Sequence, residues 1–448
     1  MNKTLCGKLL AAAVAAACGA ASAQVSCRVE PDYAVRLADK PGEAYVKVTL
    51  AAEKVAAKNR PSVNLAIVLD RSGSMNGDKI VKAREAACEA IMRLDARDIV
   101  SVVAYDNRSE VIVPAQHVTE KEALAARVRA IVPGGMTALF DGVAAGAAEL
   151  KKFRGQCEIN RVLLLSDGQA NVGPSSAEEL GRYGALLMKD GVAVSTVGLG
   201  ADYNEDLMTR LSQKSDGNSY FVEKSDVLPR VFANELGDVL SIAATRVQLK
   251  VRFGEGFVPV ALIGRDGRIA DGVVSIDLNQ LYGGQEKYVI VKCDAAPGAA
   301  GSAREVAKAE VAYVDPASEK ERTATGSGSV TYSADASAVD ASVNRDVVRE
   351  RVRNENALRL EEALRLADRG EFKAAQRMAV LSASAAADAM KAVGGSDEEL
   401  RREADSQAAN ISNLDSGNFS GSIRKKMKTE SFQLMNQQIQ SAGRTESE

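Results

Sequence analysis

From Asn64 onward, short apolar runs alternate with amphipathic stretches, and this alternation constrains the fold more than any other feature of the chain. The run Leu65 to Leu69 precedes apolar residues at helical spacing between Lys79 and Leu94. Further apolar runs, again separated by predicted helices, lie at 99–105, 161–165 and 192–199. Strands that are apolar on both faces and alternate with helices indicate a mostly parallel sheet covered on both sides. We therefore expect one doubly wound α/β domain over residues 61–245.

From Arg246 the apolar residues change to the alternating spacing of β-strands. Val247, Leu249 and Val251 alternate with polar residues, and similar runs separated by turn residues continue to about residue 334. This pattern predicts a β-sandwich over residues 246–334. Residues 24–60 contain a similar alternation, so we expect them to supply the first strands of the sandwich. The α/β domain would then be an insertion next to it.

The C-terminal part is predicted to be helical. Apolar stripes at helical spacing, interrupted at Gly370, indicate a helical hairpin over residues 340–391. Residues 392–448 are rich in Ser, Asn and Gln, and we expect a weakly helical or disordered tail. We interpret the basic cluster in this tail as a solvated face rather than a binding patch; it comprises Arg424, Lys425, Lys426 and Lys428.

Residues 1–23 have the features of a secretory signal peptide. Lys3 and Lys8 supply a basic start, the apolar core follows, and Ala21-Ser22-Ala23 is an A-x-A cleavage site before Gln24. The apolar run is shorter than the roughly 20 residues of a membrane span, and no other apolar stretch of the sequence is long enough to span a membrane. A lipid anchor at Cys18 is the alternative. We expect an exported protein that is periplasmic, outer-membrane-associated or extracellular.

Four cysteines follow the predicted signal peptide: Cys27, Cys88, Cys157 and Cys293. An even count in an oxidising compartment permits two disulfides. We favour Cys27 with Cys293 and Cys88 with Cys157, because each pair then falls within one expected domain. The alternative for Cys88 is a buried thiol on a helix.

The composition disfavours several classes of function. With 57 basic and 60 acidic residues, the chain has no basic surplus that would indicate nucleic acid binding. It contains no Trp and only 4% aromatic residues, so stacking platforms for bases are not expected. The single histidine, His117, is interpreted as a surface residue at a strand end. Triads and zinc sites built on histidine would all have to use it.

Oxygen-bearing side chains follow the ends of the predicted strands. Asp70, Ser72 and Ser74 come directly after the first buried strand, and Asp167 follows the strand at 161–165. Thr137 lies in a Gly-rich turn before a helix. Ligands bind at the carboxyl ends of strands in open parallel sheets, and the topology would bring these loops to one edge. Carboxylates and hydroxyls suit Mg²⁺, Ca²⁺ or Mn²⁺ rather than Zn²⁺.

The order of these residues resembles the metal-ion-dependent adhesion site of von Willebrand factor A (VWA) domains. The resemblance implies a Rossmann-like domain and a Mg²⁺ site with one open coordination position, for which Ca²⁺ or Mn²⁺ are possible substitutes. The implied metal ligands are Asp70, Ser72, Ser74, Thr137 and Asp167. An Asp or Glu of a protein partner would complete the site. The order of segments along the chain is similar to exported bacterial VWA proteins and, more loosely, to inter-alpha-trypsin inhibitor heavy chains.

We therefore expect a metal-dependent protein-binding module, for adhesion or envelope assembly, and not an enzyme. A metal-dependent hydrolase is one alternative, but the sequence offers no evident base, and Asp141 is the only further carboxylate close to Thr137. A metal-independent structural scaffold is another. A narrower alternative for the site is that Ser72 and Ser74 only cap the following helix.

Overall fold

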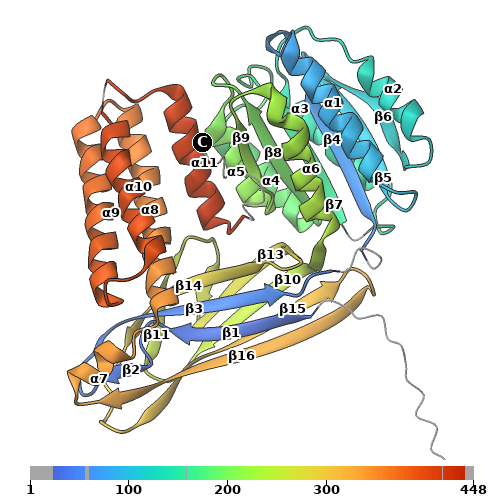
Figure 1. Ribbon diagram of the computed structural model, residues 1–448. Helices are drawn as coiled ribbons and strands as arrows, with labels where there is room; N and C mark the ends of the chain where they lie inside the picture. The colour runs from blue at the N-terminus through green and yellow to red at the C-terminus, as the bar shows by residue number, and fades with distance from the viewer. Residues whose placement is uncertain (1–23, 56–59, 158, 416, 439–448) are drawn as a thin grey trace, which may run out of the picture.

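The computed structural model describes residues 24–55, 60–157, 159–415 and 417–438. The predicted signal peptide, including Cys18, lies outside the described residues. The chain forms an α/β domain, a β-sandwich below it, and a group of helices beside both (Figure 1). Within the described ranges, no helix is long and apolar enough to cross a membrane.

The α/β domain is built on a six-stranded sheet with the order β6-β5-β4-β7-β8-β9. Five strands are parallel, and β6 runs antiparallel to β5. The strands are β4 (Val63–Asp70), β5 (Ile99–Tyr105), β6 (Ser109–His117), β7 (Ile159–Ser166), β8 (Val192–Leu199) and β9 (Ser219–Val222). Every residue of β4, β5 and β8 is buried, which explains their continuous apolar runs.

Helices cover both faces of this sheet. One face packs against α1 (Asp78–Arg93), α2 (Lys121–Arg129) and α6 (Leu228–Leu240). The other packs against α3 (Leu139–Lys151), α4 (Ala177–Lys189) and α5 (Glu205–Ser215). Two short 3₁₀ turns are η2 (Gly73–Met75) and η3 (Ser225–Val227). The expected doubly wound parallel sheet is confirmed. The expected strand end at His117 is the end of the edge strand β6, whose extent was not predicted because it is only partly buried and its hydrophobic pattern is weak.

Two further sheets pack face to face as the sandwich, with apolar residues of both in one core. The first has the order β1-β3-β14-β11: β1 (Val25–Pro31), β3 (Gly42–Ala52), β14 (Glu286–Ala295), β11 (Phe257–Ile263). The second has the order β12-β13-β10-β15-β16-β2: β12 (Arg268–Ala270), β13 (Val273–Tyr282), β10 (Ile242–Phe253), β15 (Ala303–Asp315), β16 (Lys320–Ser333), β2 (Val35–Leu37). Since β3 pairs with both β1 and β14, the α/β domain is inserted between strands of one sandwich.

Buried charges join the α/β domain to the sandwich. The Asp216 carboxylate, at the end of α5, lies 3.1 Å from the Lys287 ammonium of β14 and 3.7 Å from the Arg265 guanidinium. Burial alone would raise the pKa of Asp216, but these two cations outweigh burial and hold it below its ordinary value. Nearby, the fully buried Arg161 of β7 donates to the Tyr282 hydroxyl of β13 over 2.8 Å. Such paired buried charges fix the relative position of the two parts.

Five helices follow the sandwich in the described residues: α7 (Ala336–Ala341), α8 (Arg345–Asp368), α9 (Phe372–Ala392), α10 (Glu398–Asn413) and α11 (Gly421–Met435). The last two differ from the expected weakly helical or disordered tail. Leu400 of α10, together with Met427 and Phe432 of α11, is buried in the folded chain. These apolar residues are too sparse to form an evident stripe, and they are buried because α8, α9 and the α/β domain supply the opposing surfaces.

The basic cluster of α11 is not a solvated face, and that interpretation was wrong. Arg424 pairs with Glu205, with Asp206 at 2.7 Å and with Asp368 at 2.7 Å. Lys425 is buried and lies 2.6 Å from Glu205. The acidic partners belong to α5 and α8, so α11 bridges the α/β domain and the other helices (Figure 1). The sequence could not show this because the partners are far away along the chain.

The expected bond between Cys27 and Cys293 is also wrong. Cys27 of β1 pairs in register with Leu50 of β3, whereas Cys293 of β14 pairs with Ala44 of β3. The distance from Ala44 to Leu50 along the strand is roughly 20 Å at about 3.3 Å per residue, and a disulfide requires Cα atoms within about 7 Å. Burial raises the pKa of the Cys27 thiol to about 11 and that of Cys293 to about 12, which makes both unreactive.

The second expected disulfide is absent as well, since the described residues contain no cystine. Cys88 lies on α1 over one face of the sheet, and its thiol approaches the Ala125 carbonyl at 3.6 Å. Cys157 follows α3, which covers the opposite face. Both thiols are buried, and the alternative of a buried thiol at Cys88 describes the structure.

We predict that Lys287→Met destabilises the protein by about 3 kcal/mol, because it leaves the buried Asp216 carboxylate without its nearest cation. The measurement is urea denaturation followed by circular dichroism. Lys292→Met is the matched control: Lys292 is on the same strand and pairs with Glu43 at 2.5 Å, but on the surface. Equal stability of the two variants would contradict the role given to the buried pair.

We predict that Lys425→Met loosens α11 without unfolding the sheet. The variant removes one of the two cations that pair with the buried Glu205 carboxylate, so limited proteolysis should cleave between α10 and α11 several times faster. Lys426→Met, on the exposed side of the same helix, should be cleaved at the wild-type rate. Identical cleavage of both variants would mean that the ion cluster does not hold α11 in place.

Candidate metal site

The candidate site lies where β4 and β7 end side by side. Asp70 is the last residue of β4, and Asp167 directly follows β7. The two strands are parallel neighbours, with Leu69 opposite Leu165. From β4 the chain proceeds to β5 on one side, and it later returns to β7 on the other side. This reversal of strand order is the position at which open α/β sheets bind ligands.

The loop after β4 turns back on its own carboxylate. The Ser72 amide donates to Asp70 Oδ1 over 2.8 Å, and residues 73–75 form the 3₁₀ turn η2. The hydroxyls of Ser72 and Ser74 lie 3.0 Å apart, and Ser74 donates to Asp167 Oδ1 over 2.7 Å. Helix α1 begins later, with Gly77 as its N-cap and no side-chain cap. The alternative that the two serines cap this helix is therefore wrong.

Thr137 reaches the same place from the loop between α2 and α3. Backbone hydrogen bonds tie this loop to the first one: Gly134 donates to the Arg71 carbonyl over 2.7 Å, and Gly73 donates to the Gly135 carbonyl over 3.0 Å. The Thr137 hydroxyl and the Ser74 hydroxyl both converge on Gly168. A Cβ atom there would lie 3.3 Å from the first and 3.4 Å from the second. All five predicted residues thus lie in one cluster.

Asp70 is held by two residues that the sequence analysis did not single out. Its Oδ2 accepts from the Ser166 hydroxyl over 2.8 Å and lies 3.3 Å from the Tyr105 hydroxyl. Burial raises the pKa of Asp70 to about 6, and the negative charge of Asp167 adds to the shift. Tyr105 ends β5, the other neighbour of β4, so the argument from strand ends that found Asp167 also applies to it.

Lys79 is a third residue that the sequence analysis missed as part of the site. Its ammonium lies 2.5 Å from Asp167 Oδ2. Since Ser74 already donates to Oδ1, both carboxylate oxygens of Asp167 accept from side chains of this chain. Lys79 lies in the first turn of α1, and nothing in the sequence distinguishes it from other surface lysines.

The donors suit a hard divalent cation. They are two carboxylates and three hydroxyls, all oxygen, without sulfur or imidazole. Within the described residues, no three or more His, Cys, Asp or Glu side chains form a group that could hold a metal ion. An ion here would therefore depend on the hydroxyls as well as the carboxylates. Five protein donors are fewer than the roughly six that Mg²⁺ takes, so a position remains for water or for another molecule.

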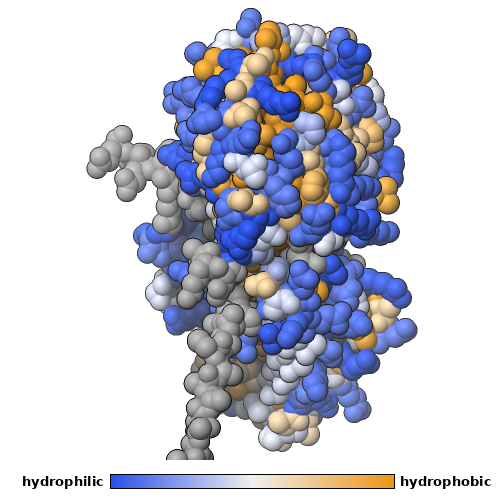
Figure 2. Space-filling model, turned by 90° about the vertical axis from the view of Figure 1, so that its right-hand side faces the viewer, coloured by the Kyte–Doolittle hydropathy of each residue, from blue (hydrophilic) through white to orange (hydrophobic). Residues whose placement is uncertain are grey.

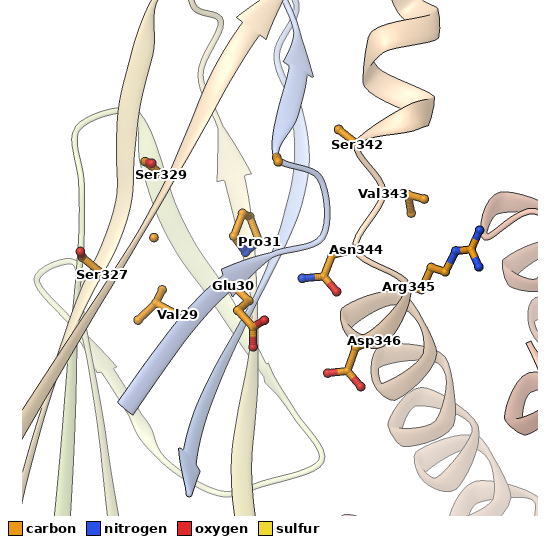
Figure 3. Close-up of a pocket in the computed structure, with 12 residues that line it drawn as sticks. Val29, Glu30, Pro31, Ser327, Ser329, Ser342, Val343, Asn344, Arg345 and Asp346 are labelled. Carbon is orange, nitrogen blue, oxygen red and sulfur yellow. The ribbon is translucent and has the colours of Figure 1, made fainter. Parts of the chain in front are cut away.

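A cavity elsewhere in the described residues also contains carboxylates and hydroxyls, but Asp346, one of its two carboxylates, is paired with Lys47. It has a volume of about 640 Å³ and lies between the sandwich and the start of α8. In Figure 3, Asn344 and Asp346 point toward Glu30 and Pro31, whereas Arg345 points away. The Asn344 side chain caps α8 by accepting from the Val347 amide, so it serves the fold. We therefore take the cluster at Asp70 and Asp167 as the candidate site.

Comparisons with known proteins concern the α/β domain that carries these residues. The family model described as von Willebrand factor type A domain matches residues 64–234. An uncharacterized protein of Synechocystis is 26% identical over 46% of this chain and 48% of its own. The uncharacterized protein YfbK of Escherichia coli is 25% identical over 48% of this chain and 37% of its own. Human inter-alpha-trypsin inhibitor heavy chain H3 is 26% identical over 34% of this chain and 18% of its own. The chain thus spans half or less of these relatives.

Solved structures extend the similarity in fold beyond that domain. A von Willebrand factor type A protein from Catenulispora acidiphila has a TM-score of 0.66 at 17% identity, covering 81% of this chain and 88% of its own. The ArnB paralog VWA2 from Sulfolobus acidocaldarius has a TM-score of 0.59 at 18% identity, covering 92% and 98%. Both matches extend well beyond the α/β domain, so they share more than that fold.

We predict that Asp70 makes the metal-free protein less stable as the pH rises. Its pKa of about 6 in the folded state exceeds the ordinary 3.8, so the folded state binds the proton more tightly. Stability is then lost between about pH 4 and pH 6, by roughly 3 kcal/mol. In EDTA, Asp70→Asn should show a smaller loss by urea denaturation at pH 4.5 and 7.5. The exposed Asp78→Asn should behave as wild type; an unchanged pH dependence in Asp70→Asn would contradict the burial argument.

Proposed function

We propose that this protein, whose residues 64–234 form a von Willebrand factor type A domain, is a metal-dependent protein-binding module. The proposed ligands of a Mg²⁺-type ion are Asp70, Ser72, Ser74, Thr137 and Asp167. A carboxylate of a protein partner would take the remaining position. The single observation that supports this proposal best is the convergence of these oxygens, from three separate loops, at one sheet edge.

The residues of the site have separate tasks in this proposal. When bound, the divalent ion supplies an electrophilic position that attracts an anionic oxygen. Asp70 and Asp167 supply the negative charge that attracts the ion, and the hydroxyls add neutral donors. Ser166 and Tyr105 keep the Asp70 carboxylate oriented through their contacts with its second oxygen. Ca²⁺ and Mn²⁺ would use the same donors.

The surroundings of the site favour a protein partner over a small anion. The loop that carries Thr137 also exposes Val132 and Met136, whose exposed fractions are 70% and 50%. Figure 2 shows hydrophobic residues gathered over the upper part of the molecule on the side that it displays, where the α/β domain lies. Exposed apolar residues beside a polar site indicate a surface that another protein covers. The proposed partner presents Asp or Glu next to apolar side chains.

The location proposed for this function is outside the cytoplasm. The observation that supports export is the signal-like segment at residues 1–23. A periplasmic, outer-membrane-associated or extracellular protein could serve adhesion or envelope assembly, and neither role requires catalysis. We propose no catalytic residue.

We predict that the protein purified from Gln24 onward binds one Mn²⁺ or Mg²⁺ ion in isothermal titration calorimetry and that Asp70→Ala binds none. The substitution removes one of two carboxylates that attract the ion, and it should leave the circular dichroism spectrum unchanged. Asp78→Asn is the control, since it removes an exposed carboxylate from the same segment. Ion binding that persists in Asp70→Ala would contradict the site. Absence of binding in the wild type would favour a metal-independent scaffold.

Partner binding can be tested with an immobilised peptide that presents glutamate beside apolar residues and with its glutamine counterpart. The glutamate peptide should retain the protein in Mg²⁺ and release it in EDTA, and the glutamine peptide should retain it in neither. Hydrolysis of the peptide would instead support a metal-dependent hydrolase.

A further inference from the structure

We propose that Lys79 is a built-in counter-cation that makes ion binding and partner binding depend on each other. The Lys79 ammonium weakens the affinity of the empty site for a divalent ion. After the ion has bound, the same ammonium strengthens the attraction for a partner's carboxylate. This inference rests on the proposed metal site.

The contacts of Lys79 place its charge at the site. Its ammonium lies 2.5 Å from Asp167 Oδ2, and Asp167 is fully buried. The lysine side chain is 33% exposed, so it lies at the border between the buried carboxylate and the solvent. The other side chains of the described site are hydroxyls, so Lys79 and the two carboxylates supply its charge.

The position of Lys79 in its helix supports a role outside the helix. Lys79 is the second residue of α1, where the partial positive charge of the helix N-terminus disfavours a cation. Asp78 has the sign that a helix start prefers. The Asp167 carboxylate compensates the unfavourable position of Lys79, so the lysine is stabilised by the site and not by its own helix.

The balance of charge gives the consequence. The two carboxylates of Asp70 and Asp167 and the ammonium of Lys79 give the empty site one net negative charge. A divalent ion would change this to one net positive charge, which a partner carboxylate would neutralise. Without the lysine, the empty site would carry two negative charges and the loaded site none. Lys79 therefore reduces the attraction for the ion and increases the attraction for the carboxylate, and burial strengthens both effects.

This arrangement links the two binding events. A partner carboxylate would raise the affinity for the ion, and the ion would raise the affinity for the carboxylate by the same factor. At an ion concentration below the dissociation constant of the free protein, the site would fill only when a partner arrives.

The test is calorimetry of Mn²⁺ binding with and without the glutamate peptide, on the wild type and on the neutral variants Lys79→Met and Lys79→Gln. Each neutral variant should bind Mn²⁺ about tenfold more tightly than the wild type without peptide, and the peptide should raise that affinity less than it does in the wild type. Lys79→Arg keeps the charge and should retain most of the wild-type behaviour. Lys82→Met is the control, because Lys82 lies on the same helix and pairs with the exposed Glu85.

Each outcome decides the inference. If both neutral variants fold, by circular dichroism, and bind Mn²⁺ as weakly as the wild type or more weakly, Lys79 is not a competing cation, while Asp70→Ala still tests the metal site by itself. An equal peptide effect in all variants overturns the coupling. If neither neutral variant folds, Lys79 is a structural residue and the inference is wrong. A wild type that binds no ion removes both the proposed function and this inference.

Discussion

The two buried carboxylates at the ends of β4 and β7 are the constraint on which the site depends. Asp70 and Asp167 are fully buried, and like charges in such a place raise each other's energy. The surrounding polar groups offset the free-energy cost of burying these charges. They are two hydroxyls and a backbone amide around Asp70, and a hydroxyl and an ammonium around Asp167. Buried charges at the carboxyl ends of parallel strands are typical of functional sites, and a divalent cation is the ligand that these oxygens fit best.

The rest of the molecule holds this edge in a fixed frame. The α/β domain is inserted between strands of a sandwich, so both of its ends are anchored in one folded unit. The buried ion pair of Asp216 with Lys287 and the hydrogen bond from Arg161 to the Tyr282 hydroxyl join the domain to the sandwich, and ion pairs of α11 join α5 to α8. A partner that binds at the site would therefore contact a domain that is attached to the sandwich and to the C-terminal helices by several contacts, and not by a flexible linker alone.

The sequence alone was sufficient for the α/β fold and for the set of candidate ligands, and the reason is local. Strands buried on both faces must be apolar throughout, and the ends of parallel strands lie at one edge, so the sequence predicts that Asp70 and Asp167 lie close together. The hydroxyls of Ser72 and Ser74 follow from the same argument, whereas Thr137 lies in a Gly-rich turn before a helix and not at a strand end. The sequence also predicted a sandwich and a C-terminal helical region, because alternation and helical stripes are properties of contiguous residues.

Only the tertiary structure decided which distant side chains meet. The register of β3 keeps Cys27 and Cys293 apart. Arg424 of the basic cluster forms ion pairs within the chain, and the Lys79 ammonium pairs with Asp167. Each of these depends on the packing of segments that are remote in the chain, and no periodicity of contiguous residues carries that information. Residue types and their order determine the elements and the edge at which the oxygens gather. The net charge at that edge also depends on Lys79, whose ion pair with Asp167 forms only when the chain is folded.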